Sequence, residues 1–252
     1  MFEKNNLLFF EDLANDDNII HFFSKKPFNF SKKNIDSKII MENYTNIMNN
    51  LNFNFDYVRD CVQKHTNNIV ILNDSNKNDT CFDNADGIIT NLKNIPIVTY
   101  YADCQPILIY DPIKNVVGNI HSGWRGTTKK IIVNAINIMK NEFNCDVLDI
   151  KVYIGPCIHK CCFEVDEDVF DIFRENFSNI NEFTKIVRKN DNKVKYYIDT
   201  VGINISLLKN LGILVKNIFY SNICTKCNYK DIYSYRAEPL NNGRNISFIC
   251  LK

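Results

Sequence analysis

Short runs rich in isoleucine, valine and tyrosine recur through the middle of the chain and constrain its fold more than any other feature. The clearest runs cover residues 95–101, 107–110, 116–120 and 152–154. Their β-branched and aromatic content is typical of buried strands. The turn signal Asp111-Pro112 separates two of them. We therefore expect β-sheet to form much of the core.

Helical patterns lie between and after these runs. Thr127 or Thr128 can cap a helix whose apolar residues recur at helical spacing from 131 to 139. Further helices are expected to begin at Asp166 and at Thr200. The helices and strands alternate without a regular βαβ rhythm, which favours an α+β fold over a doubly wound parallel sheet.

The composition is that of an ordinary globular protein and indicates a small-molecule partner. Hydrophobic residues make up 45% of the chain and charged residues 23%. Thirty basic residues against 29 acidic ones give a net charge of +1, so the basic excess of a dedicated nucleic-acid binder is missing. No apolar run is long enough to span a membrane, and no convincing signal peptide opens the chain. We expect a cytoplasmic protein with one domain over residues 1–252, because no repeat or linker divides it.

Three candidate metal ligands stand beside the expected strands: His65, Cys104 and His121. Neutral imidazole and thiolate bind zinc well, and three protein ligands with an open fourth position are typical of catalytic zinc. Their separations match no short zinc-finger pattern. Cys104 and His121 would also suit a nucleophilic pair, in which the imidazole lowers the pKa of the thiol. Taken alone, these residues leave open a metal site, a thiol nucleophile and plain buried polar groups.

Five longer motifs identify a family. In order, the chain contains NADGIIT (84–90), YADCQPILIYDP (101–112), GNIHSGWRGT (118–127), IGPCIHKCCFEV (154–165) and CTKCNYKDIYSYRAEPLNNGRNISFI (224–249). Together these closely resemble the purine nucleoside phosphorylase family of the YfiH type, whose members also carry laccase-domain or multicopper polyphenol oxidoreductase names. The match extends from about His65 to the C-terminus, and the ADC motif combined with H-x-G-W-R-G is highly specific to this family.

The resemblance implies both a fold and an activity. The implied fold is the YfiH or CNF-like fold of cysteine-hydrolase type, in which layered mixed β-sheets are flanked by helices. The implied activity is phosphorolysis of adenosine and related purine nucleosides to base and ribose 1-phosphate, with deamination of adenosine as a second reaction. The implied cofactor is zinc, held by His65, Cys104 and His121. Copper is less expected because multicopper oxidation needs many imidazole ligands and the chain has four histidines.

The matched motifs also suggest further site residues. We expect phosphate and nucleoside to be bound by Arg125, Arg236, Lys26 and Trp124. Cys104 and Arg125 are also expected to be catalytic residues, and Asp103 or Glu164 is expected to protonate or hydrogen-bond the departing base. Asp103 is also a candidate for orienting an imidazole ligand, whereas Asp86 is expected only to cap a turn.

Two departures from the family pattern affect these expectations. The family sequence QVHG is QKHT here, which keeps Gln63 and His65 and loses the glycine. An FSTR-like segment near the N-terminus is replaced by FFSKKPFNFSKKN, with Lys26 in place of the arginine. Lysine lacks the planar fork that binds phosphate through two hydrogen bonds, so the phosphate site is expected to be weaker or differently assembled.

The cysteines are expected to be reduced thiols, because the chain is long and lacks an export signal. Cys224 and Cys227 resemble half of a zinc ribbon, and Cys157, Cys161 and Cys162 are candidates for the other half. We do not expect a second zinc, because the family resemblance runs through both stretches as part of the enzyme fold.

Overall fold

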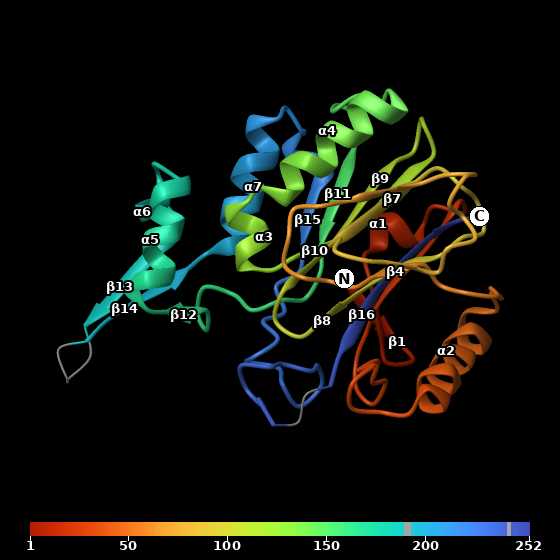
Figure 1. Cartoon of the computed structure of the whole chain (residues 1–252), viewed down its shortest axis with the longest axis horizontal. Helices are drawn as coiled ribbons and strands as arrows, with labels where there is room; N and C mark the ends of the chain where they lie inside the picture. Colours follow the sequence, from red (N-terminus) through yellow and green to blue (C-terminus); the bar gives the residue numbers. More distant parts are fainter. Residues whose placement is uncertain (189–192, 241–242) are drawn as a thin grey trace.

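Two large β-sheets lie face to face in this computed structural model, which describes residues 1–188, 193–240 and 243–252 (Figure 1). The five-stranded sheet has the order β1 (Phe2–Lys4), β2 (Leu7–Phe9), β3 (Ile19–Ser24), β16 (Asn245–Leu251) and β8 (Ile97–Tyr101). The six-stranded sheet has the order β15 (Ile218–Tyr220), β11 (Lys151–Ile154), β9 (Gln105–Asp111), β10 (Val116–Ser122), β7 (Gly87–Thr90) and β5 (Val70–Leu72). Strand β10 packs across the interface against β8 and β16.

Large side chains from both sheets fill the space between them. Tyr101, Phe23, Tyr110 and Tyr153 are all 1% exposed or less and belong to one apolar cluster. Burial of this much aromatic surface is a large favourable contribution to folding. The four runs predicted as strands correspond to β8, β9, β10 and β11.

Helices cover the outer face of each sheet. On the six-stranded sheet lie α4 (Ile131–Phe143) and α7 (Thr200–Asn210), and on the five-stranded sheet lies α2 (Ser37–Leu51) (Figure 1). The predicted apolar stripe of α4 is buried in full: Ile131, Ile132, Ala135, Ile136 and Met139. The predicted α+β fold, with layered mixed sheets flanked by helices, is confirmed.

A smaller unit projects from this core, at the left of Figure 1. It consists of the sheet β12 (Glu164–Val165), β14 (Val194–Ile198) and β13 (Thr184–Arg188), with α5 (Glu167–Asn176) and α6 (Ile180–Phe183). Phe170 stacks on Tyr196 with ring centroids 4.0 Å apart, and Phe173 packs in the same cluster. Trp124 joins that cluster from the core, so the unit is packed against the region that follows β10.

The remaining elements are short. They are α1 (Glu11–Ala14), the pair β4 (Asp60–Cys61) and β6 (Cys81–Phe82), α3 (Trp124–Thr128) and a 3₁₀ turn over Val215–Asn217. The expected cap at Thr127 or Thr128 is wrong: these threonines end α3, and Lys130 precedes α4 with φ of 57°. A left-handed residue between two helices redirects the chain, and no sequence rule assigns that conformation to lysine. Among the described helices, none is long and apolar enough to cross a membrane.

Candidate active site

His65, Cys104 and His121 converge at one end of the six-stranded sheet. Cys104 lies in the turn between β8 and β9, and the antiparallel register pairs His121 of β10 with Pro106 of β9. His65 reaches the same place from the loop before β5. The three potential ligand atoms lie within 4.8 Å of one another, and His65 Nε2 is 3.8 Å from Cys104 Sγ. The fold thus brings together the three residues expected to bind zinc.

Asp86 organises two of these three residues. Its buried carboxylate accepts a hydrogen bond from His121 Nδ1 at 2.9 Å, which leaves Nε2 of that ring directed away from Asp86. The same carboxylate accepts backbone hydrogen bonds from Lys64, His65 and Thr66, and a fourth from the Thr66 hydroxyl. Burial by itself would raise the pKa of Asp86, but hydrogen bonds from His121 and Thr66 outweigh it and lower the pKa to about 2.

The expected roles of the aspartates are therefore corrected. Asp86 orients the imidazole as well as holding a turn, whereas Asp103 accepts its hydrogen bonds from residues 225–236. Asp86 directly precedes β7, whose pairing with β10 places it beside His121. The sequence separation of 35 residues gives no hint of this contact.

The loop at His65 shows how the site forms without the family's glycine. His65 itself has φ of 58°, a left-handed conformation, and the hydrogen bonds to Asp86 hold it there. Gly123 lies against this loop: a Cβ built on it would be 2.6 Å from His65 Cδ2 and 3.1 Å from Cys104 Sγ. Only glycine therefore leaves room for the two side chains to meet.

The protonation states of Cys104 and His121 are coupled by their close contact. Burial would raise the pKa of Cys104, but the His121 and His65 rings outweigh it and lower the pKa to about 6. Burial would lower the pKa of His121, but Cys104 and Asp86 raise it. Without a metal, these shifts favour an ion pair between a Cys104 thiolate and a protonated His121. Zinc binding would release the imidazole proton, because only neutral imidazole binds the metal, and would leave one thiolate and two imidazoles as donors. The same ion pair would activate a cysteine nucleophile.

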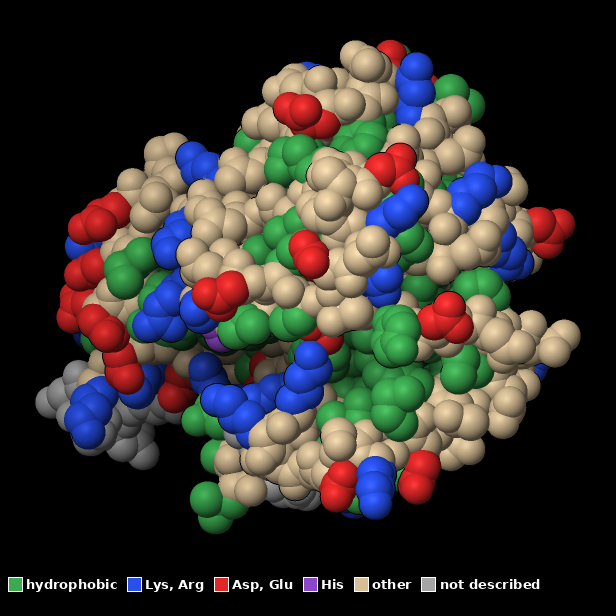
Figure 2. Space-filling view, turned by 45° about the vertical axis from the view of Figure 1, so that its right-hand side comes forward, with side chains coloured by type: hydrophobic (Ala, Val, Ile, Leu, Met, Phe, Trp, Pro, Cys, Tyr) green, Lys and Arg blue, Asp and Glu red, His purple; other side chains and the backbone are tan. Residues whose placement is uncertain are grey.

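A cavity of about 620 Å³ opens over these residues, a volume suited to a small-molecule ligand. Figure 2 shows a hollow in the surface, with a histidine inside it and lysine and arginine side chains around its mouth. Basic lining residues are Lys32, Lys33, Arg236 and Arg244. Aromatic lining residues are Tyr100, Trp124, Phe163 and Tyr235, among others.

Three of the expected site residues line this cavity beside the ligands: Asp103, Trp124 and Arg236. Asp103 has φ of 91° and accepts hydrogen bonds of 2.6 Å from both the Thr225 and Ser234 hydroxyls. It also accepts a bond of 2.7 Å from the backbone N–H of Arg236. Asp103 therefore holds in place the segment that brings Arg236 to the cavity.

The structure does not bring the other three expected residues to the described cavity lining. Arg125 is exposed, with its guanidinium carbon 4.0 Å from the centroid of the Trp124 ring. Lys26 donates to Glu238 and to the Tyr229 carbonyl, both at 2.8 Å. The Glu164 carboxylate accepts a hydrogen bond from Tyr197, and the Glu164 carbonyl accepts one from Arg236.

Sequence reasoning missed other cavity residues. Arg244 is one of them; burial lowers its pKa, and the nearby Cys104 and Asp103 oppose that shift. It stands in the matched NNGRN motif, which was the available signal. Gln63 is another: its amide donates to the Tyr100 carbonyl and accepts from the Tyr100 N–H, each at 2.8 Å. That pairing anchors the His65 loop to β8.

Comparisons with known proteins agree with these features. Residues 23–252 match the family model described as multi-copper polyphenol oxidoreductase laccase. A purine nucleoside phosphorylase of Borreliella burgdorferi is 32% identical over 228 residues, covering 87% of each chain. One of Clostridium acetobutylicum is 38% identical over 192 residues, covering 75% of each chain. An adenosine deaminase, RL5, from an unknown prokaryotic organism is 31% identical over 71% of this chain and 67% of its own.

The structural comparison points the same way. The Bacillus licheniformis protein YfiH has a TM-score of 0.86 and 25% identity, covering 99% of this chain and 98% of its own. Of the mouse and human relatives named purine nucleoside phosphorylase LACC1, this chain spans only 50% of the length. The chain belongs to the multi-copper polyphenol oxidoreductase laccase family, in which the relatives similar to it carry purine nucleoside phosphorylase names.

Proposed function

We propose that this chain is a zinc-dependent purine nucleoside phosphorylase that cleaves adenosine and related nucleosides with phosphate and also deaminates adenosine. The observation that carries the proposal is the convergence of His65, Cys104 and His121 at a cavity with basic and aromatic walls. The names of the relatives support the two reactions.

Zinc would be held by His65, Cys104 and His121, and would supply a Lewis acid that polarises an oxygen and lowers the pKa of a bound water. Asp86 fixes His121 so that Nε2 is available, and Gly123 leaves the space in which the ligands meet. Three protein ligands leave a coordination position for substrate or water, as catalytic zinc sites do.

The cavity walls supply the remaining functions of a phosphorylase. In phosphorolysis, a phosphate oxygen bonds to the anomeric carbon as the bond to the purine nitrogen breaks, and the purine leaves with the electron pair and gains a proton. Arg236 and Arg244 provide two planar guanidinium groups suited to a phosphate dianion. Trp124 and Tyr235 offer aromatic faces against which a purine can stack.

A multicopper oxidase reading has less support. Of the four histidines, two are at this site, while the buried His21 ring accepts a hydrogen bond from the Phe10 N–H. One thiolate and two imidazoles cannot supply the several copper ions of such an enzyme. A cysteine hydrolase remains as the rival, because the Cys104 thiolate would suit it equally.

The deciding experiment removes the metal and follows the products of adenosine. The zinc-loaded protein should release adenine and ribose 1-phosphate only when phosphate is present, and should lose this activity on chelation and regain it with zinc. Cys104→Ser should lack both the metal and the activity, while the exposed Cys81→Ser serves as the control. Full phosphorolysis by a verified zinc-free sample would overturn the proposal, as would phosphate-independent cleavage. Thiol alkylation alone cannot distinguish a zinc enzyme from a cysteine hydrolase, because Cys104 would be a metal ligand in the first and the nucleophile in the second.

A further inference from the structure

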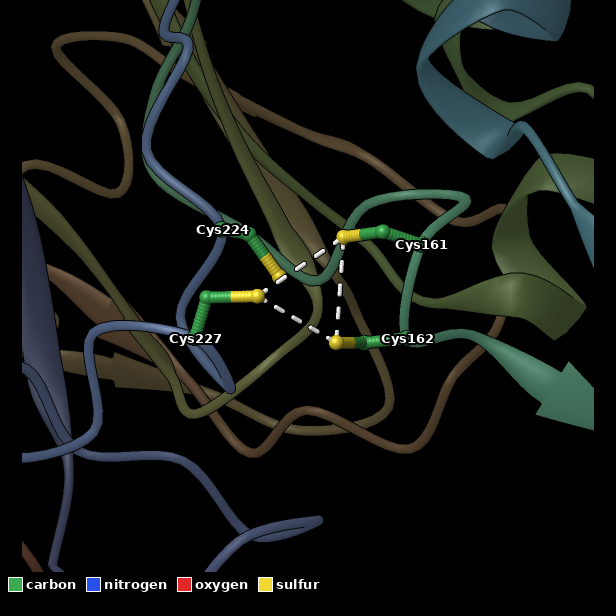
Figure 3. A group of neighbouring side chains, drawn as sticks. All are labelled: Cys161, Cys162, Cys224 and Cys227. Carbon is green, nitrogen blue, oxygen red and sulfur yellow. Dashed lines mark hydrogen bonds between the residues drawn. The ribbon is translucent and has the colours of Figure 1, made fainter.

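Four cysteines meet at a second place, outside the cavity lining. Figure 3 shows the sulfurs of Cys161, Cys162, Cys224 and Cys227 pointing toward one another from two separate turns. All four sulfurs lie within 4.8 Å of one another. The family resemblance alone predicts no second zinc here, but it does not account for the meeting of four thiols.

The sulfur separations match the size of a single metal ion. Cys161 Sγ is 3.7 Å from Cys162 Sγ and 3.8 Å from Cys227 Sγ, and Cys162 and Cys227 are separated by 3.4 Å. Four thiolates held about 2.3 Å from a tetrahedral zinc are about 3.8 Å from one another. A cluster of several irons would hold its thiolates farther apart.

Packing does not explain the arrangement. Cys224 and Cys162 contact the apolar cluster of the projecting unit, but Cys161 and Cys227 are exposed and contribute little to an apolar core. The structure describes all ten cysteines of the chain and shows each of them as a free thiol. Apolar packing therefore leaves the meeting of the two exposed sulfurs with the other two unexplained, whereas metal binding would explain it.

The backbone holds both turns in place independently of the sulfurs. Cys162 and Phe163 donate their N–H groups to the His159 carbonyl, which forms the first turn. Asn228 donates both its backbone and its side-chain N–H to the Cys224 carbonyl, which forms the second. The Thr225 N–H donates to the Cys157 carbonyl at 2.9 Å and joins the two turns.

A backbone donor also faces one of the sulfurs. The N–H of His159 donates to Cys224 Sγ at 3.5 Å. Hydrogen bonds of this kind orient metal ligands and stabilise negative charge on sulfur.

We propose that Cys161, Cys162, Cys224 and Cys227 bind one structural Zn²⁺ through four thiolates, separate from the metal at His65, Cys104 and His121. Four protein ligands close the coordination sphere, so this ion has no open position for substrate.

The site connects two walls of the cavity. One turn continues from Ile158 to Phe163, and both of these side chains line the cavity. The other leads to Tyr235 and Arg236, which line it from the opposite segment. Zinc binding therefore ties together the two segments that frame the nucleoside cavity, which gives the ion a positioning role.

Metal analysis of the full chain tests the proposal. We expect two zinc ions per chain in the wild type, one in Cys104→Ser and one in the double variant Cys161→Ser/Cys227→Ser. Cys81→Ser, which removes an exposed cysteine outside both sites, should retain two. A wild type with a single zinc that Cys104→Ser abolishes would overturn the inference while leaving the proposed function intact. Conversely, a wild-type protein that binds two zinc ions but shows no phosphorolysis would count against the proposed function and leave this inference intact.

A second measurement on the unaltered protein covers the case in which the double variant fails to fold. Mass-spectrometric thiol labelling should find Cys161, Cys162, Cys224 and Cys227 protected in the zinc-loaded protein and reactive after chelation, with Cys81 reactive in both. Cobalt substitution should give the intense sulfur-to-metal absorption of a four-thiolate site, retained in Cys104→Ser. Equal reactivity before and after chelation, or disulfides among the four in freshly purified protein, would overturn the proposal.

Discussion

Asp86 is the residue on which both the His65 loop and the His121 ring depend. Asp86→Asn keeps the shape but replaces one oxygen with an NH₂ group, which then faces N–H donors of Lys64 or Thr66. A buried donor facing a donor is unfavourable. We expect zinc binding to weaken about 10- to 100-fold, as for other partners of metal ligands. Competition with a chelator of known affinity measures the change.

The control is Asp83→Asn, three residues away in the sequence. Asp83 forms a surface ion pair with Lys64 at 2.9 Å and its side chain is 73% exposed. Exposed pairs contribute little, so zinc affinity should stay the same. Equal losses in the two variants would mean that Asp86 acts through general surface charge and not through His121.

Arg244 provides the second test at this scale, because it lines the cavity, whereas Lys26, which was expected to bind phosphate, is not among the described lining residues. Arg244→Lys keeps the charge and loses the planar fork, so the KM for phosphate should rise by roughly 10- to 100-fold. Deamination of adenosine needs no phosphate and should change less. Steady-state kinetics with varied phosphate separates the two effects. Arg125→Lys, on the exposed face of Trp124, is the matched control and should leave the phosphate KM unchanged.

At the residue scale, sequence motifs identified the three candidate metal ligands, whereas the residues that surround them are set by contacts in the fold. His65, Cys104 and His121 could be named because each lies in a distinctive motif. The role of Asp86 could not, because it arises from the pairing of β7 with β10. Lys26 was expected at the phosphate for its place in a motif, but its pairing with Glu238 depends on a segment more than two hundred residues later.

At the scale of elements, hydrophobic runs predicted the central strands well and the edge of the fold poorly. β8 to β11 are mostly buried strands, and their runs of isoleucine, valine and tyrosine predict them. The N-terminal strands β1 and β2 are three residues each, too short for a periodic signal. The break between α3 and α4 was missed because Lys130 adopts a left-handed conformation.

Strand β3 contains a group that couples the stability of its sheet to pH. His21 is 2% exposed and its Nε2 accepts the Phe10 N–H at 2.9 Å, so the ring is neutral in the folded chain. Burial lowers the pKa of His21 from 6.5 to about 3. Between these values the unfolded chain binds a proton that the folded chain does not. Stability is therefore lost as pH falls below 6.5, by about 1.4 kcal/mol per pH unit from this group.

A variant without an ionisable group at position 21 isolates the contribution of His21 to the pH dependence of stability. His21→Gln keeps an oxygen acceptor for Phe10 but cannot be protonated. Its free energy of unfolding should fall less steeply than that of the wild type between about pH 6.5 and about pH 5. Denaturant unfolding at several pH values gives both curves. Parallel curves would show that His21 is not the group responsible.

At the scale of the molecule, the layered sheets were predictable from the family resemblance and from the alternation of patterns. In the projecting unit only α5 was predicted, from its start at Asp166; the unit as a whole was not, because its cluster forms from short segments that also pack on Trp124. The expectation of one domain over residues 1–252 stays a prediction. Its test is whether the projecting unit and the two-sheet core unfold in one transition.

Zinc at the active site should stabilise the whole fold, because its ligands come from three segments that meet only in the native chain. An ion that binds only the folded state adds about 2.7 kcal/mol at a concentration 100 times its dissociation constant. For a chain of this size that corresponds to a rise of roughly 5–10 °C in Tm. Cysteines of the unfolded chain also bind zinc, so the shift should level off as zinc increases.

Calorimetry of Cys161→Ser/Cys227→Ser with and without zinc isolates this ion, since that variant retains His65, Cys104 and His121. Adding Cys104→Ser to it should abolish the shift, and a shift that survives would place the stabilising zinc elsewhere.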